Sequence, residues 1–361
     1  MGTRPVAMTP RQRIEAALRG EWADRVPLSM YWNMLPRGDA ERSLRNQGMA
    51  IVEWVRPYRV EMPNVETSTR EFYEDGVLTR RETIRTPVGE VFSVLKQEGG
   101  YGTSWWRVNH YIKRPEDYKV VDFMIRDTTY VPSYESCRLA EERLGEDGYV
   151  FARVLDVPMH RMMYELLGIE RFSIDLHERA DEFFRLHELL CAKHREAFGV
   201  AADSPAEFVM CGTNFHQDMI GLRRFEEHYV PYINEFADCL HSAGKLVACH
   251  FDAPMSTLVS AVGLMQIDVV EALTPPPTCD VTVAEARAAW PDKVLWINFP
   301  SSVHTQSPEA IQAETEKILS EAAPGDHFLI GITENIPENA WRTSLGVISQ
   351  VIRERGHLPL K

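Results

Sequence analysis

Four short apolar runs in the C-terminal half of the chain decide the fold, and the first of them, KLVACHF, occupies residues 245–251. The others are DVVEALT at 268–274, KVLWINF at 293–299 and HFLIGIT at 327–333. Each run is short and rich in Val, Ile and Leu, which is typical of a strand buried on both faces of a parallel sheet. Segments of helical length separate three of these runs, so the pattern predicts repeated βα units.

The N-terminal half adds further strands and a helix before the first of them. Thr9 is a capping residue for a helix in PRQRIEAALRG, with Pro10 at its first position. Counting strands along the chain gives about eight, at 26–32, 58–64 (the weakest), 149–155, 207–213 and the four runs above. Eight βα units predict a single (β/α)8 TIM barrel domain over 1–361. A doubly wound open sheet is the competing fold, but no glycine-rich G-x-G-x-x-G turn follows any strand.

Residues 76–125 differ from the rest of the chain. GVLTRRETIRTPVGEVFSVLK alternates β-branched and charged residues around a PVG turn, and SWWRVNHYI continues this style. The alternation predicts an antiparallel β-hairpin region inserted into the barrel. The sequence leaves open whether this region caps the barrel or joins subunits, and whether the protein is a monomer or a homodimer.

Composition excludes several classes of partner. The 361 residues include 39 Lys and Arg against 53 Asp and Glu, which gives a formal net charge of −14. Nucleic acid and anionic membranes are therefore not expected partners. The apolar runs are far shorter than the roughly 20 residues of a membrane span, and no signal peptide is recognisable, so we expect a cytoplasmic protein. The six cysteines are scattered without a C-x-x-C pair, which favours reduced thiols.

Candidate functional residues stand where the predicted strands end, because the active site of a TIM barrel lies at the carboxyl ends of its strands. Any single polar residue there is better explained by an ordinary polar loop than by a functional role. Several titratable groups in one mouth, however, require a metal, a bound cation or shared protons. The residues at these positions are Tyr31, Trp32, Asn33, Glu66, Asp156, Asn214, His216, His250, Asp252, Glu271, Asn298 and Glu334.

His250 and Asp252 are the most informative pair. On a strand, the i, i+2 spacing puts both side chains on one face, here the barrel interior. An imidazole and a carboxylate can bind a divalent metal, or they can form an acid–base pair. Glu334 is the best-placed third ligand and Cys279 a looser candidate. Seven other residues at the strand ends would contact substrate: Tyr31, Trp32, Asn33, Asn214, His216, Glu271 and Asn298.

Three stretches resemble the uroporphyrinogen decarboxylase superfamily. They are MTPRQRIEAALRGEWADRVPL, then GLRRFEEHYVPYINEFADCLHSAGKLVACHFD, and the C-terminal INFPSS with GITENIPENAW. The M-R-Q-A-G-R motif of the decarboxylase is absent, since the chain has SMYWNMLPRG near its first strand. The chain therefore resembles the corrinoid-dependent methyltransferase branch more than the true decarboxylase.

The resemblance implies a metal site and a partner. Methyltransferases of this branch bind zinc through H-x-C and a later Cys. His250 matches the histidine, Asp252 stands at the first cysteine and Glu334 lies near the second. Two carboxylates in place of two thiolates disfavour a thiol acceptor and suit an oxygen-bearing substrate. The implied activity is an O-demethylase that moves a methyl group from a small methoxylated donor to a corrinoid protein, with zinc or another divalent metal as Lewis acid.

Two other functions remain open. A metal-free decarboxylase or lyase of the same superfamily could use the same histidine and carboxylates as general acid and base on a small carboxylate substrate. A non-catalytic ligand-binding barrel is the third alternative. The density of titratable groups at the strand ends disfavours it.

Overall fold

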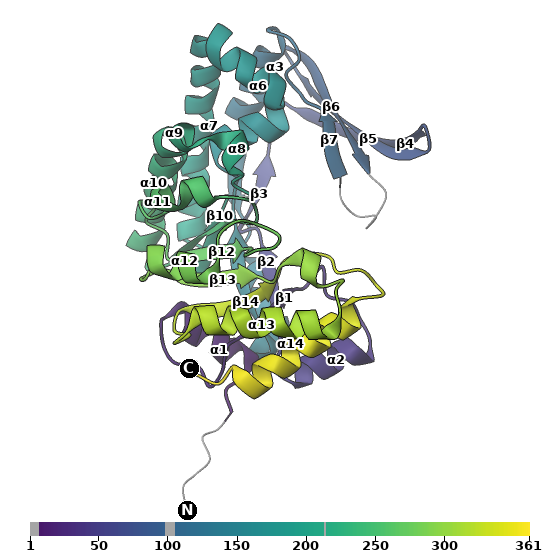
Figure 1. Ribbon diagram of the computed structural model, residues 1–361. Coiled ribbons are helices and arrows are strands. Elements are labelled where there is room, and N and C mark those ends of the chain that lie inside the picture. The colour runs from purple at the N-terminus through teal and green to yellow at the C-terminus, as the bar shows by residue number, and fades with distance from the viewer. Residues whose placement is uncertain (1–6, 98–104, 213) are drawn as a thin grey trace, which may run out of the picture. The chain divides into compact units, whose positions relative to one another are not determined.

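A barrel of eight parallel strands forms the centre of the computed structural model, which describes residues 7–97, 105–212 and 214–361 (Figure 1). β1 pairs with both β14 and β2, and these two pairings close the ring. The predicted TIM barrel is confirmed. In order around the barrel the strands are β1 (Leu28–Tyr31), β14 (Phe328–Ile332), β13 (Val294–Asn298), β12 (Val269–Leu273), β11 (Leu246–His250), β10 (Phe208–Cys211), β9 (Gly148–Arg153) and β2 (Ala50–Val55).

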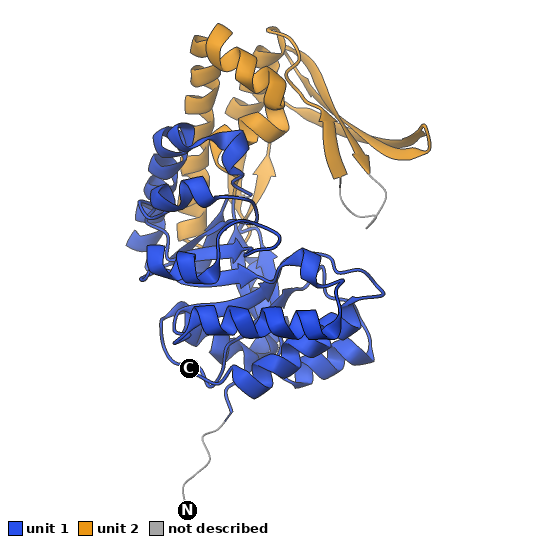
Figure 2. Cartoon of the chain, in the orientation of Figure 1, with its two compact units in different colours: residues 1–57, 134–154, 205–361 blue, residues 58–133, 155–204 orange. Residues whose placement is uncertain are grey.

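The chain divides into two compact units, and the barrel lies wholly in the first (Figure 2). This unit comprises residues 1–57, 134–154 and 205–361. Its α-helices are α1 (Pro10–Leu18), α2 (Asp39–Asn46), α4 (Glu135–Leu144), α8 (Gln217–Ile220), α9 (Leu222–Arg224), α10 (Val230–Ser242), α11 (Val259–Val262), α12 (Val283–Ala289), α13 (Pro308–Ala322) and α14 (Trp341–Arg355). Shorter turns are η1 (Gly145–Asp147), the π-helix η3 (Phe225–Tyr229), η4 (Ser256–Leu258) and η5 (Ser301–Val303).

The expected N-terminal helix is α1, and its first turn is capped as the sequence predicts. The Thr9 side chain accepts a hydrogen bond from the backbone N–H of Gln12, and the Gln12 side chain accepts one from the backbone N–H of Thr9. This reciprocal arrangement satisfies two of the N–H groups that a helix start leaves unpaired.

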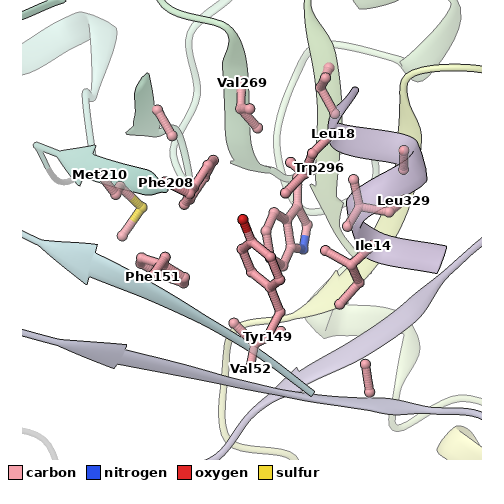
Figure 3. Close-up of a cluster of buried hydrophobic side chains, with 14 of the residues drawn as sticks. Ile14, Leu18, Val52, Tyr149, Phe151, Phe208, Met210, Val269, Trp296 and Leu329 are labelled. Atoms are coloured by element: carbon pink, nitrogen blue, oxygen red, sulfur yellow. The ribbon is translucent and has the colours of Figure 1, made fainter. Parts of the chain in front are cut away.

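Alternate residues of the barrel strands fill its interior. Figure 3 shows the aromatic rings of Tyr149, Phe151, Phe208 and Trp296 gathered in this core. The rings of Phe151 and Phe208 pack edge to face with centroids 5.3 Å apart. The side chains at the carboxyl ends of the strands therefore lie directly above a packed interior and not above an open channel, as in other barrels of this type.

The second unit comprises residues 58–133 and 155–204. It contains a four-stranded antiparallel sheet in the order β4, β5, β6, β7 and a two-stranded sheet of β3 and β8. Phe172 and Phe183 pack edge to face within its helical part. Its elements are β3 (Tyr58–Glu61), β4 (Glu66–Glu74), β5 (Val77–Thr86), β6 (Gly89–Gln97), β7 (Trp105–Asn109), α3 (Asp117–Asp127), β8 (Thr129–Pro132), α5 (Pro158–Arg161), the π-helix η2 (Met162–Leu167), α6 (Ile169–Glu178) and α7 (Ala180–Ala202).

The second barrel strand differs from the sequence prediction. It is AIVEWV of β2, whereas the predicted run 58–64 supplies β3, which pairs antiparallel with β8. Glu66 therefore begins β4 and does not end a barrel strand. A short run such as 58–64 satisfies the strand pattern equally well in either sheet, and only pairing with distant strands distinguishes the two.

The inserted β region also has other bounds than expected. Antiparallel strands β4 to β7 extend from Glu66 to Asn109, and residues 98–104 of the expected 76–125 region lie outside the described residues. The last part of that region is helix α3 and does not belong to the antiparallel sheet. Its buried apolar residues, Val120, Val121, Met124 and Ile125, follow the helical period. No helix in the described parts of the chain is long and apolar enough to cross a membrane.

Gly331 provides a test of barrel packing. A Cβ at this position would lie 2.6 Å from Nε1 of Trp296, which is fully buried and packs against Phe151 and Phe208. We expect Gly331→Ala to lower the free energy of unfolding by about 1 to 3 kcal/mol through overpacking. Urea unfolding followed by circular dichroism measures this loss.

Gly346 on α14 gives the matched control, because nothing lies within 4 Å of its added Cβ. Gly346→Ala should leave stability unchanged or raise it by up to about 1 kcal/mol, since alanine favours the helix. Equal stabilities for the two variants would contradict the packing described around Trp296.

Candidate functional site

Four of the sequence-predicted residues stand at the carboxyl ends of barrel strands and face its interior. Tyr31 is part of the buried core inside the barrel and is paired in register with Val52. His250 is paired in register with Glu271, which is itself paired with the inward Trp296. Asn298 ends β13 two residues after Trp296 and so faces the same way.

Glu271 holds two of these side chains. Its carboxylate has no exposed surface, and it accepts a hydrogen bond of 2.6 Å from the Tyr31 hydroxyl and one of 2.5 Å from Nδ1 of His250. Because a carboxylate accepts, Nδ1 of His250 carries a proton, and in the neutral imidazole Nε2 then keeps its lone pair. Burial and the neighbouring Glu271 raise the pKa of Tyr31 well above its usual value, so its hydroxyl stays a donor.

A β-bulge follows Glu271. Ala272 adopts a left-handed φ of 58°, and the register with β13 shifts between Glu271 and Leu273. In a regular strand, Glu271 and Leu273 would face the site and Thr274 would face away from it. Because of the shift, Thr274 points to the site instead and donates a hydrogen bond to Asp252. A left-handed conformation costs a residue with a side chain roughly 1 kcal/mol or more, and such strain is concentrated at functional sites.

Asp252 and Glu334 belong to one hydrogen-bonded network centred on Asn298. Asn298 Nδ2 donates to Thr274 Oγ1 at 3.2 Å and to Glu334 Oε1 at 3.4 Å. The backbone N–H of Thr333 donates to Asn298 Oδ1 at 3.0 Å, which fixes the direction of the amide. The backbone of β14 thus orients the side chain that links the two carboxylates.

The carboxyl group of Glu334 has a strongly raised pKa. Burial and the nearby Asp252 carboxylate raise its pKa to about 7, against hydrogen bonds from Ser301 and Asn298 that lower it. Nε2 of the buried His304 lies 4.0 Å from Oε1 of Glu334. Burial lowers the pKa of His304 to about 4, so this imidazole is neutral and supplies no counter-charge.

Cys279 lies close enough to the site to interact with its carboxylates. Burial raises the pKa of its thiol to about 12, and the charges of Asp252, Asp280 and Glu334 add to this effect. Without a bound cation the thiol therefore stays protonated. Thiolate chemistry at this position would require a positive charge beside it.

The site contains residues of the types that bind metal ions, but their side chains are not arranged around a common point. Within residues 7–97, 105–212 and 214–361, no three His, Cys, Asp or Glu side chains are gathered as they would be around a metal ion. His250 has the second interaction expected of a ligand histidine, since its Nδ1 is held by a carboxylate. The donor types therefore fit a divalent ion, whereas the side-chain positions do not yet converge on one.

Four other predicted residues are not hydrogen-bonded to this network. Trp32 is 40% exposed and Asn33 is exposed in the turn after β1. Asn214 is exposed in the loop after β10. Nδ1 of His216 accepts a hydrogen bond from the backbone N–H of Asp218 and caps helix α8, so this imidazole has a local structural partner.

Sequence reasoning missed three residues of the mouth. Thr274 faces the site only because of the bulge, and the sequence DVVEALT gives no sign of a bulge. His304 lies after a short turn, where no strand end draws attention to it. Arg153 could have been found, because in YVFARVL it follows Tyr149 and Phe151 at the same two-residue spacing as the inward positions.

The raised pKa of Glu334 predicts how the metal-free protein responds to pH. Because this pKa is higher in the folded than in the unfolded chain, folding favours the protonated form. Stability should be greatest near pH 5 and should fall by up to about 3 kcal/mol as pH rises through 7. In Glu334→Gln, which cannot ionise, this fall should be smaller.

Thermal unfolding of EDTA-treated wild type and Glu334→Gln between about pH 5 and pH 8 measures the effect. The same pH dependence in both proteins would show that the carboxyl titrates normally in the folded chain.

Comparisons with known proteins agree with the barrel. Residues 106–345 match the family profile described as uroporphyrinogen decarboxylase. Among solved structures, a methyltransferase from Methanosarcina mazei is similar at a TM-score of 0.59 and 12% identity, over 96% of this chain and 99% of that one. A broad-specificity endoglucanase from an uncultured bacterium reaches a TM-score of only 0.45 at 8% identity, over 96% and 97%. No curated protein sequence matches the chain.

Proposed function

Since the chain belongs to the uroporphyrinogen decarboxylase family, we propose that it is a methyltransferase of that family. It would move a methyl group from a small methoxylated substrate to a corrinoid carried by a partner protein. The observation that supports this proposal most directly is the hydrogen bond from His250 Nδ1 to the buried carboxylate of Glu271. In the neutral imidazole this bond leaves Nε2 with its lone pair, which a metal ion could accept.

The metal of this proposal would be zinc or another divalent ion held by His250, Asp252 and Glu334. Asp252 and Glu334 lie close enough for one charge to raise the pKa of the other, which is the situation that a cation between them would relieve. Binding by all three would require their side chains to move, because no three such ligands are gathered around one point in the described residues, and Cys279 would be a further ligand. When bound, the ion would withdraw charge from the substrate oxygen as a Lewis acid.

The protein's own residues would position the reacting groups. Glu271, which also accepts a hydrogen bond from Tyr31, orients the His250 ring. Asn298, oriented by the backbone N–H of Thr333, donates from its side chain to the Glu334 carboxylate. Such orientation before substrate binding lowers the barrier, because the groups need no rearrangement during the reaction. The buried core below the mouth closes the site to water from that side.

A second candidate is a metal-free decarboxylase or lyase acting on a small carboxylate. The observation that favours it is the pKa of Glu334, about 7, which suits a general acid or base at neutral pH. In that case His250 and Glu334 would transfer protons and the site would need no ion.

Metal content distinguishes the two candidates. Protein purified from zinc-supplemented cells should contain about one equivalent of metal, and His250→Ala should lose it. His216→Ala is the matched control and should keep the metal, because its imidazole caps α8. A metal-free protein with full activity would contradict the first candidate.

The orienting role of Glu271 has its own test. Glu271→Gln keeps the size of the side chain but removes the charge that holds the His250 proton on Nδ1. We expect zinc affinity to fall by roughly 10- to 100-fold, measured by competition with a chelating dye. An unchanged affinity would show that His250 is not a ligand.

The reaction itself can be followed by the absorbance change from cob(I)alamin to methylcobalamin with methoxylated substrates. Demethylated product should form in equal amount to methylcobalamin. Release of carbon dioxide without methyl transfer would favour the second candidate.

A further inference from the structure

Arg153 is a cation inside the barrel mouth that neither proposed chemistry uses. It ends β9 and is paired in register with Met210, whose side chain is part of the buried core inside the barrel. Neighbouring residues in register share a face of the sheet, so the Arg153 side chain also points inward. Its guanidinium lies 5.5 Å from the centre of the Trp54 ring, at the end of the adjacent strand β2. It also lies close enough to Tyr31 to act on the pKa of that hydroxyl.

No ion pair of this guanidinium is present in the part of the chain that the structure describes. Among the described residues, no carboxylate oxygen lies within 4.0 Å of Arg153, and no hydrogen bond from its guanidinium is found. A partly buried charge is costly unless it is paired. Stacking on Trp54 contributes only about 0.5 to 2 kcal/mol and leaves the five N–H donors of the guanidinium unused.

The carboxylates of the site lie on other strands. Asp252 follows β11 and Glu334 follows β14, which are two and three places from β9 in the order around the barrel. Asn298, which links the two carboxylates through Thr274, ends β13, the strand opposite β9. The cation and the indole therefore stand on β9 and β2, and the two carboxylates belong to a separate part of the barrel rim.

We propose that Arg153 binds a carboxylate of the substrate, so that the enzyme acts on small carboxylic acids whose reacting group lies near Asp252 and Glu334. A planar guanidinium pairs with a carboxylate through two parallel hydrogen bonds. The indole of Trp54 offers an apolar surface beside that pair. This proposal names the substrate class of the proposed methyltransferase, so its catalytic meaning rests on the proposed function. Binding of a carboxylate to Arg153 does not depend on that function.

The charges of the mouth favour a carboxylate over a phosphate. Three carboxyl groups, those of Asp252, Glu271 and Glu334, belong to the same barrel mouth as the Arg153 guanidinium. A dianion would meet about twice the repulsion of a monoanion from each ionised carboxylate. The ligand chemistry that fits is therefore one negative charge on a small, partly apolar body.

Equilibrium binding tests the proposal without activity. Isothermal titration of the full-length protein would use 3-methoxybenzoate, 4-methoxybenzoate and methoxyacetate, each against its primary amide, which has the same shape without the charge. We expect at least one acid to bind about tenfold or more tightly than its amide, the range of a charge-assisted hydrogen-bonded pair. Arg153→Gln should abolish this preference while leaving amide binding unchanged.

Two further variants separate charge from packing. Arg153→Lys keeps the charge without the two-pronged geometry and should retain part of the preference. Arg138→Gln removes a charge from the exposed face of α4 and should bind like wild type. Circular dichroism and thermal unfolding establish that each variant is folded.

The proposal is overturned if no acid binds more tightly than its amide. It is equally overturned if folded Arg153→Gln binds acids like wild type, or if phenyl phosphate binds more tightly than the benzoates. Failure of the proposed function looks different, because binding needs neither corrinoid nor metal. Acids that bind through Arg153 but donate no methyl group to cob(I)alamin would refute methyl transfer and leave this inference standing.

Discussion

The carboxylate of Glu271 lies inside the barrel with no exposed surface, and the arrangement of the mouth depends on its need for hydrogen-bond donors. A buried carboxylate without donors would cost several kcal/mol. Tyr31 from β1 and His250 from β11 supply them, and each side chain is held in place by doing so. One buried acid therefore fixes the phenol, the orientation of the imidazole and the proton on Nδ1.

The bulge at Ala272 lets one strand serve both parts of the site. Glu271 before the bulge holds His250, and Thr274 after it donates to Asp252. In a regular strand, residues 271 and 274 would point to opposite faces. The left-handed backbone of Ala272 is thus the local cost of bringing the histidine and the carboxylate network into one mouth.

Charge is distributed unevenly around the barrel. The charge of Asp252 raises the pKa of Glu334, and the buried imidazole of His304 beside Glu334 is neutral. Arg153 stands on β9 beside Trp54 of β2, and no carboxylate among the described residues pairs with it. The two groups of side chains are complementary to different parts of a ligand: the carboxylates to a cation or a protonated group, and the guanidinium to an anion.

The sequence by itself determined the barrel and the inward direction of its strand ends. Apolar runs of strand length identified seven of the barrel strands, and the two-residue period of a strand put His250 and Asp252 on one face, because both properties are local. Tertiary structure decided which residues these side chains meet. The second strand is 50–55 because it pairs with β1 and β9, and Thr274 enters the site because of a register shift against β13. Pairing between residues far apart in the chain sets both, and no local pattern records it.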